Sequence, residues 1–400
     1  MKKKKKEKKI LYQLIFSAFL LFSNAYLVKA NSDILSQDST GKYCINTEQD
    51  YYNFIENIQN YNNKTVILCN DIDISDVPEA TSSFGGILNG KGHTITYASK
   101  EAKENIAVFP FRINDNGIVE NINVQIDESY AYNSETDEFQ TVFSQCDGIA
   151  KGITIKGNVT CIYDDEDEDV SIGAIEGNGT LMDSSIAITY DLQSEKTIEE
   201  IAEDIVENDL EFEFCQLGTT YTGITYQNCI GYGQYSEAIK SLADELEPKI
   251  EDDTWGSLYV SFTRKSFFST SASATNCYYD KENMPDIKIR SEYIANRDNN
   301  KEFPNYADFG KTTSEMKNQG TYEGFDFNKK WTISPEDNNG YPYYNLQTEE
   351  ITLKVQASTE PKVWSTSVPR DYNRFVDYAK NYHFRSEEHT SELQSHLNLV

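Results

Sequence analysis

The feature that most constrains the fold is a short pattern that returns at a fixed interval. Gly117, Gly148 and Gly179 each open a run of alternating apolar and polar residues, and consecutive glycines lie 31 residues apart. Each run is too short to bury its own apolar side chains, so the copies must stack on one another to be stable. The spacing therefore predicts a solenoid built from stacked β coils.

Similar short β runs beside glycine or asparagine extend this pattern on both sides. They are FGGILNGKGHTITY at residues 84–97, GITYQNCIGYG at 223–233 and TNCYYD at 275–280. Glycine supplies the positive φ that a tight corner requires, and asparagine tolerates the same conformation. At about 30 residues per coil, residues 65–280 are expected to hold roughly seven coils.

Three segments predict helices instead of strands. Thr47 precedes an amphipathic stretch, and Asp50 takes the acidic position of a capping box three residues later. We expect this helix to cover the first coil, because an open strand edge recruits other chains. Residues 195–211 and 236–246 place isoleucine and leucine at helical spacing among acids. These two insertions are expected either to lie against the flank of the stack or to form a lid or partner-binding helix.

The charge and the N-terminus restrict partners and location. The chain carries 65 acidic and 36 basic residues, a net charge of −29, so nucleic acid is not expected as a partner. A lysine-rich start, an apolar run at residues 10–22 and small residues before Ala30 form the three parts of a secretory signal. The sequence predicts that residues 1–30 are a signal peptide and that the protein is secreted or lies at the cell surface.

The C-terminal part changes character twice. Residues 350–384 follow a linker at 347–349 and begin like a strand, which predicts the start of a truncated second domain. Residues 385–400 open with RSEEHTSELQS, which resembles a translated sequencing adapter, and they are left out of the fold. We expect the natural chain to continue beyond Phe384.

Seven cysteines are spread too widely for a small disulfide scaffold, and no Cys-x-x-Cys spacing predicts zinc. In an exporting compartment Cys44 and Cys69 are a candidate pair. Cys69 also lies in an apolar run, as do Cys161 and Cys229, and there cysteine acts as a small buried hydrophobe. The pairing therefore stays open.

Aromatic residues gather near the end of the predicted stack. Trp331, Tyr341, Tyr343 and Tyr344 are the candidate binding residues, because aromatic rings stack on sugars. The alternative is that this aromatic group, which begins at Tyr322, covers the last coil, since large aromatic side chains are usually buried.

The acidic run DDEDED at residues 164–169 is the one candidate metal site. Asp164, Asp165, Asp167 and Asp169 supply the hard oxygen ligands that Ca²⁺ prefers. An unbroken acidic run lacks the glycine turn and alternating ligands of a formed calcium loop, so a solvated loop is the alternative. No other cofactor is expected.

Three blocks together resemble a known family. They are INTEQDYYNFIENI through VILCNDIDIS, then FGGILNGKGHTI with VFPF and GIVENINV, and last NCYYD with GKTTSEMKNQGTYEGFDFNKKWTISPEDNNGYPYYNL. These blocks resemble the secreted, adhesin-like bacterial proteins with GLUG-type repeats, and they cover most of residues 43–346. The resemblance implies an all-β fold, a right-handed parallel β-helix over residues 31–346, with an N-terminal helical cap, a C-terminal capping segment and two helical insertions.

The same resemblance implies function. It predicts adhesion or extracellular binding without catalysis, with a host glycan, matrix component or cell-surface protein as partner. Membrane contact is expected only through the signal peptide or a missing C-terminal anchor. The alternatives are a polysaccharide lyase or hydrolase on this fold and the stalk of a larger exported enzyme. Hydrolysis requires two carboxylates, and the G-H-G pattern of pectin hydrolases fails at Thr94, so His93 is expected to be a turn residue.

Overall fold

The computed structural model describes residues 35–345, apart from residues 76, 79, 81, 99–107, 132–139, 164–168, 219–222, 252–253, 262, 264–271, 299–302 and 304–305. The predicted signal peptide at 1–30, the linker at 347–349, the second domain at 350–384 and the adapter-like tail at 385–400 lie outside the described residues. By its own contacts the chain divides after Thr348 into two units, and every described residue belongs to the first.

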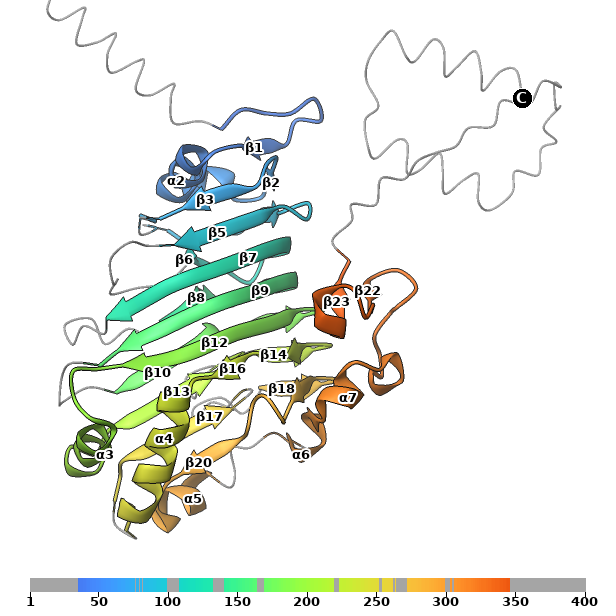
Figure 1. Ribbon diagram of the computed structural model, residues 1–400. Helices are drawn as coiled ribbons and strands as arrows, with labels where there is room; N and C mark the ends of the chain where they lie inside the picture. The colour runs from blue at the N-terminus through green and yellow to red at the C-terminus, as the bar shows by residue number, and fades with distance from the viewer. Residues whose placement is uncertain are drawn as a thin grey trace, which may run out of the picture. The chain divides into compact units, whose positions relative to one another are not determined.

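Most elements of the described part are strands, which gather into three sheets (Figure 1). The first sheet contains β1 (Tyr43–Ile45), β2 (Thr65–Leu68), β3 (Ile72–Ile74), β4 (Ile87–Asn89), β5 (Thr94–Ala98), β7 (Ile118–Ala131), β9 (Ile149–Ile162), β11 (Thr180–Met182), β12 (Ser185–Gln193), β14 (Thr225–Gln227), β15 (Ile230–Gly231), β16 (Gln234–Tyr235), β18 (Ser273–Thr275), β19 (Tyr278–Asp280) and β21 (Gly310–Lys311). The second contains β6 (Phe109–Ile113), β8 (Gln140–Cys146), β10 (Val170–Ile175), β13 (Glu211–Cys215), β17 (Ser257–Ser261) and β20 (Ile287–Ile289). The third pairs β22 (Trp331–Thr332) with β23 (Tyr343–Tyr344).

The chain alternates between the first two sheets. β7, β9 and β12 are neighbours in the first sheet, while β8 and β10, which connect them in sequence, are neighbours in the second. All described pairs of the first sheet are parallel. The second sheet is parallel except where β17 pairs with β20, so it is mixed. The prediction of a mostly β fold with large parallel sheets is thus confirmed.

The register of these parallel strands equals the spacing of the glycine pattern. Ile118 pairs with Ile149, and Ile149 with Thr180, each 31 residues further along the chain. The N–H of Ile149 donates to the carbonyl of Gly117 at 3.0 Å. A Cβ on Gly148 would lie 2.3 Å from that same carbonyl oxygen. Glycine is required here because the stacked corners approach too closely for any side chain.

The first strands are covered by the helix predicted after Thr47. Helix α2 (Glu48–Glu56) begins where expected, and the Thr47 hydroxyl accepts from the backbone N–H of Asp50 at 3.2 Å. The predicted capping box also requires the Asp50 carboxylate to accept from the N–H of Thr47. It accepts instead from the N–H of Asn46, one residue earlier, at 3.0 Å. α2 and the 3-10 turn η1 (Ile58–Tyr61) bury Phe54 and Ile58 in the main core.

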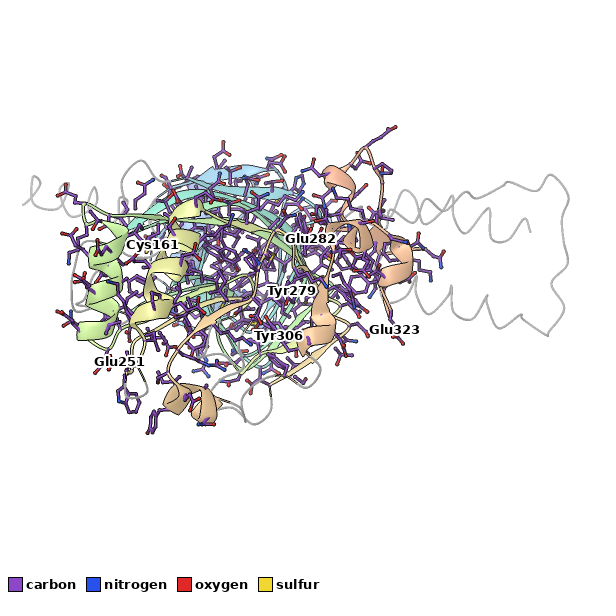
Figure 2. The ribbon with its side chains drawn as sticks, turned by 60° about the horizontal axis from the view of Figure 1, so that its bottom comes forward. Cys161, Glu251, Tyr279, Glu282, Tyr306 and Glu323 are labelled. Carbon is purple, nitrogen blue, oxygen red and sulfur yellow. A yellow bond between two sulfur atoms is a disulfide. The ribbon has the colours of Figure 1, made fainter. Side chains whose placement is uncertain are left out.

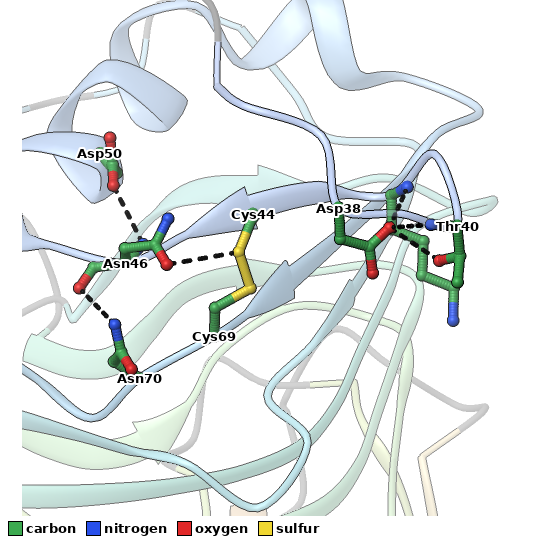
Figure 3. The surroundings of a disulfide bond; sticks show 8 residues. Asp38, Thr40, Cys44, Asn46, Asp50, Cys69 and Asn70 are labelled. Carbon is green, nitrogen blue, oxygen red and sulfur yellow. Dashed lines mark hydrogen bonds between the residues drawn. A yellow bond between two sulfur atoms is a disulfide. The ribbon is translucent and has the colours of Figure 1, made fainter.

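Cys44 and Cys69 form a disulfide, which resolves the pairing left open by the sequence (Figure 3). Cys44 lies in β1 and Cys69 directly follows β2, so the bond links two neighbouring strands across the 25 residues that include α2. The remaining cysteines lie outside this bond and are buried in the protein: Cys146, Cys161, Cys215, Cys229 and Cys277.

The two predicted helical insertions are present as α3 (Ile198–Glu207) and α4 (Glu237–Leu246). They lengthen the interval between paired strands, to 45 residues between Asp183 and Asn228 and to 48 between Asn228 and Asn276. Both helices bury apolar side chains, including Ile205 and Leu242, in the main core. They therefore pack on the sheets, as the interpretation of flanking long loops expects.

The last strands are covered by short elements between residues 287 and 309. These are the antiparallel strand β20, α5 (Glu292–Asp298) and α6 (Tyr306–Phe309), and the 3-10 turn η2 (Glu247–Lys249) precedes them. Figure 2 looks onto this end, where Tyr279 and Tyr306 lie near the middle, with ring centroids 5.9 Å apart. Phe303 and Phe309 join the same core, so this end is covered before the closing aromatic block begins.

Candidate functional site

The closing segment, residues 310–345, packs on the outward side of the first sheet. It contains α7 (Thr313–Met316) and the 3-10 turns η3 (Gln319–Thr321) and η4 (Asn338–Gly340). Neighbouring residues of β19 point to opposite sides of the sheet, so Tyr279 enters the main core while Tyr278 packs against Tyr322 and Phe325. The sequence placed these aromatics over the last coil. The structure places them instead over the outward side of the last strands.

The four aromatic residues predicted to bind a ligand lie close together but differ in exposure. Trp331 is 2% exposed, and its ring centroid lies 4.6 Å from that of Phe325 and 5.6 Å from that of Tyr344. Tyr341 stacks on Tyr232 at 4.5 Å and is also buried. Protein atoms thus occupy the faces of these rings, and their predicted binding role stays a prediction.

Tyr343 and Tyr344 contribute instead to an open hollow between the closing segment and the sheet. The hollow has a volume of about 290 Å³. It is lined by two tyrosines, two amides, a hydroxyl, an ammonium and a carboxylate: Tyr343, Tyr344, Asn123, Asn338, Thr154, Lys156 and Asp337. This mixture of aromatic and polar groups makes it the candidate binding site.

The side chains that the sheet contributes to this hollow lie beside one another because of the parallel strand register. Asn123 of β7 pairs with Thr154 of β9, and Ser185 of β12 follows in the same row, where its hydroxyl donates to Thr154 Oγ1 at 3.3 Å. The next residues, Val124 and Ile155, point the other way into the main core. Strand alternation therefore gives the outward side of the sheet a row of short polar side chains.

Lys156 links the sheet to the closing segment. Its Nζ donates to Asn338 Oδ1 at 2.6 Å. Asn338 Nδ2 in turn donates to the carbonyl oxygens of Tyr341 and Pro342, each at 3.2 Å, so the amide is firmly held. Burial lowers the pKa of the Lys156 ammonium below its usual value. The site thus holds a half-buried lysine against a fixed amide.

Two buried carboxylates anchor the closing segment beside the hollow. Asp280, fully buried in β19, accepts from the hydroxyls of Tyr341 at 2.5 Å and Thr313 at 2.7 Å. Asp183, directly after β11, accepts from Lys330 Nζ at 2.8 Å. These contacts hold the turn that carries Asn338 in place on the sheet.

Most of the candidate calcium ligands cannot be compared with the structure. Asp164, Asp165 and Asp167 lie outside the described residues. Asp169 accepts from the backbone N–H of Glu211 at 2.6 Å. Across the described ranges there is no cluster of three or more His, Cys, Asp or Glu arranged to hold a metal ion.

His93 lies in a turn, as the sequence predicts. Its N–H donates to the Gly90 carbonyl at 2.8 Å, and its Nδ1 lies 3.0 Å from Asp71 Oδ1. The N–H of Thr94 donates to the same Asp71 oxygen at 2.9 Å, and this bond and the contact with His93 lower the pKa of that carboxyl.

The sequence reasoning missed five residues of the hollow: Asn123, Thr154, Lys156, Asp337 and Asn338. A signal for two of them was present, because Asn123 and Thr154 are 31 residues apart and occupy the same place in successive copies of the pattern. The approach of Asn338 to Lys156, 182 residues away in sequence, has no local signal.

Comparison of the chain with models of protein families, with curated proteins and with solved structures found no match. The helices of the described part are all too short or too polar to cross a membrane. The site must therefore be interpreted from its own chemistry.

Proposed function

We propose that this protein is a right-handed parallel β-helix, exported from the cell, that binds extracellular carbohydrate or a glycan-bearing cell surface without catalysis. The alternation between two sheets, with an interval of 31 residues that repeats from β4 through β7 and β9 to β11, supports the β-helix, and strand crossovers in parallel sheets are almost always right-handed. The blocks that resemble GLUG-type proteins and the predicted secretory signal support an exported, adhesin-like role.

One observation carries the binding function, namely the composition of the hollow beside Tyr343. A sugar presents many hydroxyl groups, which both donate and accept hydrogen bonds, and a flat apolar ring face. Asn123 and Thr154 offer donors and acceptors, Asp337 offers acceptors, and Tyr343 offers an aromatic surface. Small-molecule sites commonly combine such ring surfaces with a few fixed polar groups.

The lining favours binding over hydrolysis. Cleavage of a glycosidic bond uses two carboxyl groups, and among the described residues Asp337 is the one carboxylate that lines the hollow. The rival is a polysaccharide lyase, which needs a proton acceptor. Lys156 is the observation that favours it, because a lysine whose pKa is lowered by burial is a better general base at moderate pH.

The stacked strands suit adhesion. Outward polar side chains recur along neighbouring strands, as in the row Thr94, Asn123, Thr154 and Ser185. A rigid repetitive face makes many weak contacts at once, and linked weak contacts add up to strong attachment. A stalk for a larger exported enzyme would present the same face.

The test measures binding and turnover together on the full chain. We expect saturable binding to members of a glycan panel, or to glycan-bearing cells, without new reducing ends or unsaturated sugar products. Tyr343→Ala should weaken binding. Tyr293→Ala, which removes a 53% exposed tyrosine outside the hollow, is the matched control and should not. Steady product formation would favour the lyase or hydrolase, and binding unaffected by either variant would exclude this hollow as the site.

A further inference from the structure

We propose that the hollow selects acidic sugars, with Lys156 binding the carboxylate or sulfate group of the glycan. This inference rests on the proposed function and specifies its ligand class. It follows from the position of one lysine relative to the charges around it.

The ammonium of Lys156 has an amide partner but no acidic one. Its described contact is with Asn338 Oδ1, and no carboxylate of the described residues lies within 4.0 Å of its Nζ. Other lysines of the described part form such pairs, for example Lys151 with Glu120 at 2.8 Å. Lys156 differs from these lysines because its ammonium is half-buried, is bonded to an uncharged amide and lines the hollow, so an anion bound there would supply its charge partner.

The strand neighbours of Lys156 are also uncharged. Gln125 of β7 and Ala187 of β12 flank it in the parallel ladder. Asp337 lines the hollow, but it comes from the exposed turn of the closing segment and makes no ion pair with this ammonium. A partly desolvated cation facing an open hollow favours an anion strongly, because charge-assisted hydrogen bonds are about twice as strong as neutral ones.

The remaining lining groups suit the rest of an acidic sugar. With its carboxylate on Lys156, a uronate has ring hydroxyls to place near Asn123, Thr154 and Asp337, and a ring face to place against Tyr343. The uronate carboxylate and the Lys156 ammonium neutralise each other, and Asp337 accepts from sugar hydroxyls. The volume of about 290 Å³ lies near the lower end of small-molecule sites, which suits a short sugar unit.

Long-range charge does not oppose this recognition at physiological ionic strength. The chain is strongly acidic, yet its other charges are screened beyond about 8 Å at 0.15 M salt. A contact with the half-buried Lys156 is screened less. Selection therefore depends on Lys156 itself more than on the average charge of the protein.

The experiment compares glycans that differ only in charge. Oligogalacturonate and its methyl ester share one backbone, and so do dextran sulfate and dextran, so the two pairs test carboxylate and sulfate separately. We expect the full chain to bind at least one charged member about 10-fold or more tightly than its neutral counterpart. Lys156→Met should lower affinity for that charged glycan by about 10-fold to 100-fold, the effect of losing one charged hydrogen bond. Lys156→Arg should retain most of the affinity.

Lys151→Met is the matched control, a lysine of the same strand that lies outside the hollow. Equal binding of charged and neutral glycans would overturn this inference and leave the proposed function intact. An equal loss in Lys156→Met and Lys151→Met would also overturn it, because the preference would then come from general charge. Absence of binding to every glycan would overturn both.

Discussion

The stacked glycine corners make a sharp prediction for Gly148→Ala. The added Cβ would lie 2.3 Å from the carbonyl oxygen of Gly117 and 2.4 Å from that of Asn114. Contacts between carbon and a carbonyl oxygen are normally about 3.3 Å or longer. The corner must therefore move by roughly 1 Å, and both obstacles are backbone atoms that side-chain rotation does not relieve.

The loss of folding stability can be estimated from the hydrogen bonds that such a movement disturbs. Ile149 donates to Gly117 at 3.0 Å and Thr180 donates to Gly148 at 2.9 Å, so both ladders meet at this corner. Losing two hydrogen bonds, each worth about 1 kcal/mol, together with overpacking of about 1–3 kcal/mol, gives a destabilisation of about 3–5 kcal/mol. For a unit of about 300 residues this corresponds to a fall in Tm of roughly 5–8 °C.

The assay is thermal unfolding followed by circular dichroism, with Gly320→Ala as the matched control. Gly320 is exposed, and a Cβ there would meet only the Asn318 side chain at 3.3 Å. The control should melt within about 1 °C of the unmodified protein, because surface substitutions usually change stability by less than 0.5 kcal/mol. If Gly148→Ala melted together with the control, the close stacking of the corners would be refuted.

Three further predictions concern the lysine of the hollow, the disulfide and the anchor of the closing segment. Burial lowers the pKa of Lys156, so between the folded pKa and 10.5 the unfolded chain binds more protons than the folded chain. The stability of the wild type relative to Lys156→Met should therefore rise with pH in that window, as measured by thermal unfolding of both proteins at several pH values. A reductant should lower Tm by roughly 5 °C in a chain with the Cys44–Cys69 bond, because closing a 25-residue loop contributes about 3 kcal/mol to the free energy of unfolding. The reductant should leave Tm unchanged in a variant with serine at both positions. Tyr341→Phe should destabilise the fold by about 1–3 kcal/mol and speed proteolysis of the closing segment, because the buried Asp280 loses a hydrogen-bond donor. An equal effect of Tyr343→Phe on stability and proteolysis would contradict this.

The strands and helices were largely predictable because their signals are local and repeat. The interval from Gly117 to Gly148 to Gly179 is itself the strand register, so the sequence contains the pairing directly. Thr47 marks a helix start because its side chain satisfies an N–H of the first turn, which depends only on neighbouring residues. The insertions at α3 and α4 were equally visible from their helical spacing.

The position of the closing segment was not predictable in the same way. Its aromatic content indicates burial, but both the end of the sheets and their outward side offer an apolar surface to cover. The choice depends on Phe303, Tyr306 and Phe309, which already cover the end. It also depends on polar anchors such as Asp183 with Lys330, 147 residues apart. Contacts at such separation leave no periodic trace in the sequence.

The candidate site exists because the closing segment lies on the outward side of the first sheet. The outward side of a parallel strand is nearly flat, since alternate side chains project to one level, and a flat surface surrounds little of a ligand. The turn at Asn338 adds a second wall over Asn123, Thr154 and Lys156, and so converts part of that surface into a hollow. The wall must remain in place for binding, and its anchors are therefore part of the function. Tyr341→Phe should therefore lower the free energy of glycan binding as well as the free energy of unfolding. If it lowered the binding free energy by less than the unfolding free energy, recognition would have to reside on the open face of the sheet instead.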